Sequence, residues 1–133
     1  MQRPTPAFIG ASWAALGAGA LTYIVTPWQA DMPLNEKGYY LTVLIFGLFA
    51  VISLQKAVRD RLEGIPVTSI YYGLAWVATG FCMLLLAVGL WNADMINTEK
   101  GLYGMAFSLA LFGSVAVQKN IRDVAAFDAP VSA

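Results

Sequence analysis

The chain has 133 residues, of which 59% are hydrophobic and 12% charged, and its formal net charge is zero. The charged share is about half of the usual ~25%, and a neutral chain lacks the basic footprint of a nucleic-acid-binding protein. There is no histidine, and Cys82 is the only cysteine. We therefore expect no zinc site built from histidine and cysteine, no iron–sulfur cluster, no disulfide and no cofactor. Cys82 is expected to pack in the interior or to face lipid.

Four stretches carry no formal charge, and they lie at residues 4–30, 38–55, 64–93 and 101–118. A membrane-spanning helix needs about 20 mostly apolar residues, with a range of roughly 17–25. Because backbone polar groups in hydrocarbon must be paired internally, these stretches predict helices. The predicted fold class is an all-α membrane protein, a single domain over residues 1–133 with four transmembrane helices.

The helix boundaries can be read in chain order. Thr5 and Pro6 predict the start of the first helix, which we expect to run to about Thr26 with the next two residues, Pro27 and Trp28, at the membrane interface. A second helix is expected from near Glu36 until Gly64 and Pro66, about two turns beyond the bilayer.

The third helix is expected from Thr68 or Ser69 to about Trp91. The fourth is expected to begin near Glu99, with Thr98 as its cap, and to fray after Asp123. Residues 127–133 are predicted to be disordered.

The sequence is an internal repeat. Residues 5–60 align without a gap on residues 68–123, with 21 identities in 56 positions. Each copy predicts a two-helix hairpin, and two such hairpins have the same orientation in the membrane. We expect near-identical halves related by a twofold axis along the membrane normal. The repeat also disfavours a cleaved signal peptide, an alternative suggested by Arg3 and the triplet Ala18, Gly19 and Ala20.

The basic residues predict the orientation. Six lie on the side of both termini and only two, Lys37 and Lys100, on the other side. Because Lys and Arg concentrate in cytoplasmic segments, both termini are expected in the cytoplasm. The six are Arg3, Lys56, Arg59, Arg61, Lys119 and Arg122.

The motif Gln-Lys-x-x-Arg-Asp occurs once in each half, and its four side chains share one helix face. Interfacial anchoring of two short helices is one interpretation. A basic cytoplasmic surface for anionic lipid or a soluble partner is the other. The residues are Gln55, Lys56, Arg59 and Asp60 in the first half and Gln118, Lys119, Arg122 and Asp123 in the second.

A second repeated motif occupies residues 28–38 and 91–101, where an outer turn enters a helix. We interpret it as structural, and the alternative is a paired acidic mouth that attracts a cation. Its candidate residues are Trp28, Asp31, Glu36, Trp91, Asp94 and Glu99. Their spacing fixes no metal geometry.

Small residues recur at helical spacing and predict close helix packing, within the bundle or between subunits. The sets are Ala11, Ala15 and Gly19; Gly10, Ala14 and Ala18; Ala106, Ala110 and Ser114; and the pairs Gly10/Gly17 and Gly73/Gly80.

No acidic, basic or histidine residue lies deep in a predicted span, which disfavours proton relays and most ion-coupled carriers. Since no nucleophile–base pair or phosphate loop occurs either, an enzyme is not expected.

Several segments together resemble the YiaA/YiaB two-helix domain family of bacterial inner-membrane proteins. They are residues 36–40, 53–60, 89–94, 99–101, 103–107 and 117–123. The resemblance covers residues 5–123 as two tandem copies. The first copy departs at Pro27 and Pro33, where the second has Leu90 and Ile96, so the two outer turns are expected to differ. The resemblance implies an inner-membrane protein of unassigned activity and supplies no catalytic or ligand residue.

The function expected from the sequence is therefore structural or interactive rather than enzymatic. The alternatives are a small oligomeric channel or transporter, and an accessory subunit of a larger membrane complex. The expected partners are membrane lipids, including anionic lipids, a second copy of the chain, and an unidentified membrane or cytoplasmic protein.

Overall fold

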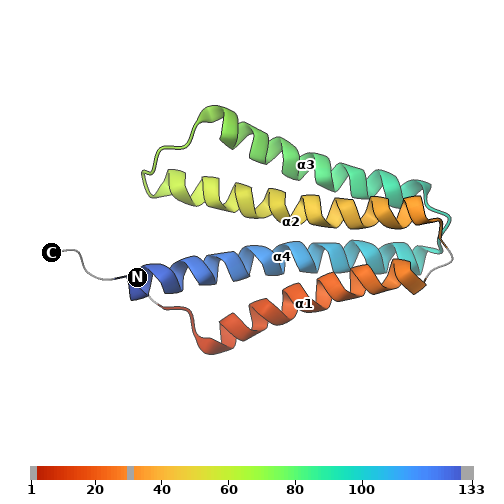
Figure 1. Ribbon diagram of the computed structural model, residues 1–133, viewed down its shortest axis with the longest axis horizontal. Helices are drawn as coiled ribbons and strands as arrows, with labels where there is room; N and C mark the ends of the chain where they lie inside the picture. The colour runs from red at the N-terminus through yellow and green to blue at the C-terminus, as the bar shows by residue number, and fades with distance from the viewer. Residues whose placement is uncertain (1–2, 30–31, 130–133) are drawn as a thin grey trace.

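The computed structural model describes residues 3–29 and 32–129, and this part of the chain is helical apart from its turns and ends (Figure 1). Its helices are α1 (Pro6–Gln29), α2 (Leu34–Leu62), α3 (Ser69–Asn92) and α4 (Asn97–Asp128). Each is long and apolar enough to cross a membrane. The predicted fold class is confirmed.

Side chains and one glycine set the helix ends as expected. The hydroxyl of Thr5 accepts from the Phe8 N–H at 3.1 Å, and the hydroxyl of Thr68 accepts from the Tyr71 N–H at 3.2 Å. After α2, Gly64 has a φ of 77°. The Ile65 N–H then donates to the Asp60 carbonyl at 2.8 Å, the pattern of a Schellman C-cap, in which a glycine tolerates the left-handed backbone.

Several boundaries differ from the prediction, and α2 begins at Leu34, two residues before the expected Glu36. α1 continues through Pro27 to Gln29, because a proline in the last turn removes only one backbone donor and the helix ends two residues later. α4 begins at Asn97, so Thr98 is not its cap; the preceding residue, Ile96, takes that position without a side-chain hydrogen bond.

α4 also extends past the point where fraying was expected. It ends at Asp128, so residues 127 and 128 of the predicted disordered tail are helical. Ala125 and Ala126, strong helix formers, carry the helix that far. Residues 130–133 of that tail lie outside the described residues.

The two halves interlock. α1 packs mainly on α4 and α2 on α3, with α2 and α4 adjacent between these pairs (Figure 1). α1 and α2, the helices of the first predicted hairpin, contact each other far less. The repeat predicts two equivalent hairpins but not which helices pack together, and the main contacts of each helix are with the other half. Exchanging the halves still converts the α1–α4 contact into the α3–α2 contact, as a pseudo-twofold relation requires.

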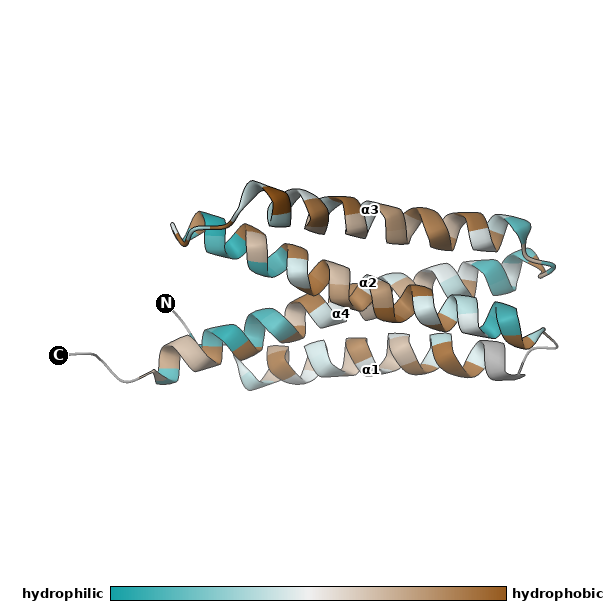
Figure 2. Ribbon diagram, turned by 45° about the horizontal axis from the view of Figure 1, so that its top comes forward, coloured by the Kyte–Doolittle hydropathy of each residue, from teal (hydrophilic) through white to brown (hydrophobic). Residues whose placement is uncertain are grey.

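The start of α1, the end of α4 and the α2–α3 loop lie at one end of the bundle, which we name the termini end (Figure 1). The end of α1, the start of α2 and the α3–α4 connection lie at the opposite end, which we name the turn end. Hydrophilic residues gather at both ends of α2 and α4, and apolar residues fill the middle of the helices (Figure 2). A membrane slab fits across this apolar middle.

Aromatic side chains fill the core near the turn end. The rings of Tyr40 and Tyr103, equivalent residues of the two halves, stack with centroids 5.3 Å apart. Tyr23 meets Tyr103 edge-on at 5.5 Å and donates from its hydroxyl to the Tyr40 carbonyl at 2.8 Å. These contacts join α1, α2 and α4.

Small residues bring the helices of each pair close together, but not all of the predicted ones do so. A Cβ on Gly19 would lie 2.5 Å from the backbone nitrogen of Ala110, so α1 and α4 touch there. Ala106, Ala110 and Ser114 are buried. By contrast, the predicted glycine seams have open space beside them, and that expectation is wrong for packing within the chain. Those glycines are Gly10, Gly17, Gly73 and Gly80.

Candidate functional site

The two Gln-Lys-x-x-Arg-Asp motifs meet at the termini end, on the adjacent helices α2 and α4. Arg59 of the first half pairs with Asp123 of the second, and Arg122 of the second half pairs with Asp60 of the first. Because these residues are equivalent in the repeat, the two ion pairs are reciprocal. We name the four residues the crossed ion pairs.

Each aspartate of the crossed ion pairs also accepts from a lysine one turn earlier on its own helix. Lys56 Nζ lies 3.0 Å from Asp60 Oδ2, and Lys119 Nζ lies 2.8 Å from Asp123 Oδ2. The aspartate side chains are only 8% and 10% exposed, whereas the lysine side chains are 59% and 54% exposed. The carboxylates are thus sequestered, whereas the lysine side chains paired with them remain more than half exposed.

Glu63 extends the network on one side only. Its carboxylate accepts from Arg59 Nε at 3.2 Å and from Arg122 Nη2 at 3.3 Å. The equivalent position in the second half is Ala126, so this link has no counterpart. Arg59 Nη1 is buried and has no hydrogen-bond partner among the described residues.

The two glutamines of the motifs are partly buried and make no hydrogen bond to a described residue. Gln55 and Arg59 line a groove of about 370 Å³ whose other walls are apolar residues of α2 and Val115 of α4. The structure therefore places all eight motif residues at one end of the bundle. It assigns half of them to contacts between the helices.

The candidate residues of the outer turns do not form a comparable cluster. Glu36, Asp94 and Glu99 are exposed, and Trp91 is 85% exposed. The Trp28 side chain and Asp31 lie outside the described part of the structure. Within the described residues, no group of three or more acidic or cysteine side chains could hold a metal ion.

Sequence reasoning missed two buried polar arrangements. One is the tyrosine core described above, although the identity of Tyr40 and Tyr103 in the repeat was available as a signal. The other joins α1 to α4, where Asn120 Nδ2 donates to Ser12 Oγ at 3.0 Å. The equivalent residues of the other half, Ala57 and Ala75, have no polar side chain, so the repeat gave no indication of it.

These features define a membrane protein with four helices, built from two interlocked copies of a two-helix unit. Comparison with known families gives the same answer, because the model of the yiaA/B two helix domain matches residues 8–60 and again residues 71–123. The chain belongs to this family.

Three named relatives are similar to the chain. Inner membrane protein YiaA of Escherichia coli is 57% identical over 119 residues, which cover 90% of this chain and 82% of that protein. Inner membrane protein YiaB of the same organism is 34% identical over 105 residues, which cover 77% of this chain and 87% of that protein. The uncharacterized membrane protein YubF of Bacillus subtilis is 36% identical over 63 residues, 47% of this chain and 72% of that protein. No solved structure matches the chain.

Proposed function

We propose that this protein is a non-enzymatic structural protein of the bacterial inner membrane whose termini end faces the cytoplasm and binds anionic lipid. The observation that carries this proposal is that the charged residues at the crossed ion pairs differ in role. The arginines and aspartates hold α2 against α4, and the two lysines beside them remain more than half exposed.

The charge balance of the two ends supports the orientation. The termini end carries six basic and four acidic residues, and the turn end carries two basic and four acidic residues. Lysine and arginine near helix ends favour the cytoplasmic side. The cytoplasmic side also has the more negative lipid surface. Each lysine near that surface adds about 1 kcal/mol to the attraction between protein and lipid.

A groove beside the crossed ion pairs can hold an acyl chain of the lipid. The groove of about 370 Å³ is bounded by Val51, Leu54 and Val58 of α2, with Gln55 and Arg59 also on its walls. An acyl chain suits its apolar walls, and the lipid phosphate would then lie near the lysine and arginine heads.

The orientation is tested with cysteines introduced singly at Arg61, Ala129 and Asn97. Membrane-impermeant maleimide applied to the cytoplasmic face should label the first two, and labelling of Asn97 should require access from the other face. Cys82 is 1% exposed, so it gives little background. Labelling of Ala129 from outside would overturn the orientation.

Lipid binding is tested with Lys56→Gln/Lys119→Gln in nanodiscs or by native mass spectrometry. Loss of two lysines should weaken the binding of an anionic phospholipid roughly 10- to 30-fold. The matched control is Arg3→Gln/Arg61→Gln, which removes the same charge from the same end. Equal weakening by both pairs would leave only general electrostatic attraction, and unchanged binding by the lysine variant would remove the lipid surface.

The same measurement reports the copy number of the particle and so tests the self-association that is expected from the sequence. A protein that co-purifies at fixed stoichiometry and is lost with the lysine variant would instead identify the termini end as a protein-binding surface. Release of an encapsulated dye or ion by the reconstituted protein would contradict a structural role and favour a channel.

A further inference from the structure

The turn end contains a cleft between consecutive helices that the protein does not fill. α3 and α4 are joined by a turn at residues 93–96, yet α3 packs on α2 and α4 on α1, and the backbones of α3 and α4 hardly approach each other. The resulting cleft has a volume of about 420 Å³. That volume lies within the range of roughly 300–1,000 Å³ typical of small-molecule sites.

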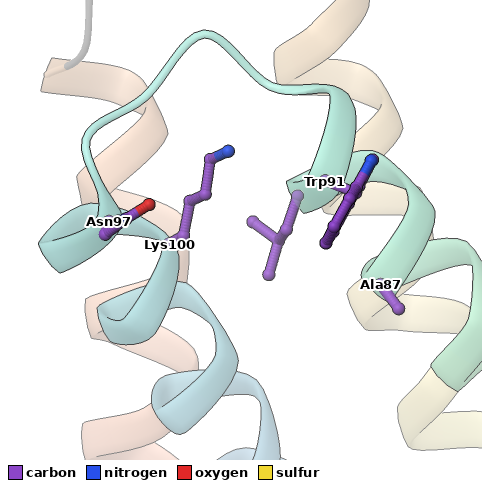
Figure 3. Close-up of a pocket in the computed structure, with 5 residues that line it drawn as sticks. Ala87, Trp91, Asn97 and Lys100 are labelled. Carbon is purple, nitrogen blue, oxygen red and sulfur yellow. The ribbon is translucent and has the colours of Figure 1, made fainter.

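The cleft has an apolar wall and a polar rim. Ala87 and Leu90 of α3 supply apolar surface, and Trp91, Asn97 and Lys100 supply hydrogen-bond donors. In Figure 3 the amine of Lys100 and the indole nitrogen of Trp91 both lie toward the connecting turn, on opposite sides of the opening, while Ala87 lies deeper along α3.

The rim side chains Trp91, Asn97 and Lys100 make no hydrogen bond or ion pair with another described residue. Lys100 forms no ion pair with any described residue, and Trp91 is 85% exposed. The start of α4 adds further unused donors, because its cap Ile96 provides no side-chain hydrogen bond to the first turn. A cation with indole, amide and helix-start N–H donors at one rim suits the oxygens of a phosphate group.

The surrounding charges restrict the kind of phosphate compound. Asp94 and Glu99 are exposed and lie next to the rim in sequence, and the whole turn end has two basic against four acidic residues. A ligand with net negative charge would be repelled by this excess of carboxylates. A zwitterionic headgroup can direct its phosphate to Lys100 and its ammonium group to the carboxylates.

We infer that the α3–α4 cleft binds one zwitterionic phospholipid of the ethanolamine type, with its phosphate at Lys100 and Trp91 and an acyl chain along Ala87 and Leu90. The site lies at the headgroup level of the leaflet opposite to the termini end. It uses residues that are distinct from those of the proposed anionic lipid surface, so either proposal can fail without the other.

The full-length protein is tested by native mass spectrometry after equal exposure to phosphatidylethanolamine and phosphatidylglycerol in mixed micelles. Because the termini end is itself proposed to bind anionic lipid, retention is compared in the Lys56→Gln/Lys119→Gln background. This parent should retain phosphatidylethanolamine in preference. Lys100→Gln should reduce this retention roughly fivefold, as expected for one lysine near a lipid headgroup. Ala87→Trp, a surface change that fills the cleft without altering charge, should reduce it as well.

Lys37→Gln is the matched control. Lys37 is the repeat equivalent of Lys100 at the same end, so this variant removes the same charge. It should leave retention within twofold of the parent with the same background. Glycerophosphoethanolamine, the headgroup without acyl chains, should not displace the bound lipid at equal concentration. Unchanged retention in Lys100→Gln, preference for phosphatidylglycerol, or displacement by the chainless headgroup would each overturn the inference.

Discussion

Identical residues of the two halves do not have identical surroundings. Tyr40 and Tyr103 are equivalent and stack on each other, but Tyr23, whose ring meets Tyr103 edge-on, has Leu86 as its counterpart. Tyr23 donates a hydrogen bond across the helices, whereas the buried hydroxyl of Tyr103 has no partner among the described residues. A buried hydroxyl contributes to stability only when it is paired, because its desolvation costs free energy.

Tyr23→Phe should therefore destabilise the bundle by about 1 kcal/mol, the typical contribution of one buried hydrogen bond. Tyr103→Phe, the matched control, removes an unpaired hydroxyl and should leave stability unchanged or slightly raised. Unfolding titrations in mixed micelles measure both free energies. A larger loss for Tyr103→Phe would mean that this hydroxyl does find a partner.

The crossed ion pairs make a second prediction at this scale. Asp60→Asn and Asp123→Asn should each cost about 1.5–3 kcal/mol, because each removes the main counter-charge of a partly buried arginine that keeps only its contact with Glu63. Glu63→Gln removes a carboxylate that is 47% exposed and should cost less than about 1 kcal/mol. Similar small losses for all three variants would show that the motifs are only interfacial anchors.

At the scale of the helices, the two equivalent close contacts take their glycine from different helices of the pair. Gly19 on α1 faces Ala110 on α4, while the equivalent contact pairs Cys82 on α3 with Gly47 on α2. In one pair the first helix supplies the glycine, and in the other pair the second helix supplies it. Each contact thus keeps one glycine, since a side chain on both helices would force them apart.

Gly19→Ala should destabilise the α1–α4 contact by roughly 1–3 kcal/mol, because its Cβ would meet backbone atoms of Ala106 and Ala110 that cannot rotate away. Gly17→Ala is the matched control two residues earlier on the same helix, where a Cβ meets open space. It should be neutral or stabilising by up to about 1 kcal/mol. Thermal melting in detergent compares the two, and equal melting temperatures would contradict the close contact at Gly19.

At the scale of the whole molecule, the interlocked arrangement makes each half depend on the other. The main partner of α1 is α4 and that of α3 is α2, so neither half buries its packing surface alone. The crossed ion pairs and the tyrosine core add contacts across the same division.

A chain divided in the α2–α3 loop, with the halves co-expressed under different tags, should therefore reassemble and co-purify. Either half expressed alone should be degraded or should pair with its own copy, because the repeat makes the halves similar. A stable monomeric half would show that each hairpin packs as a closed unit. The undivided chain provides the reference melting temperature.

Hydropathy, charge and the repeat determined the helices by themselves. Four apolar stretches must become helices in a membrane whatever their neighbours, and local signals such as Thr5, Thr68 and Gly64 then fix their ends. The gapless repeat also determined that the two Gln-Lys-x-x-Arg-Asp motifs lie at the same end of the bundle.

Only the tertiary structure decided which helices pack together. A duplicated hairpin can close on itself or exchange partners with its copy, and both arrangements bury the same types of residue. The choice depends on side-chain fit at a few contacts, such as Gly19 against Ala110 and Arg59 against Asp123. Periodicity does not encode that fit, because it reports which face of a helix is apolar and not which neighbour covers it.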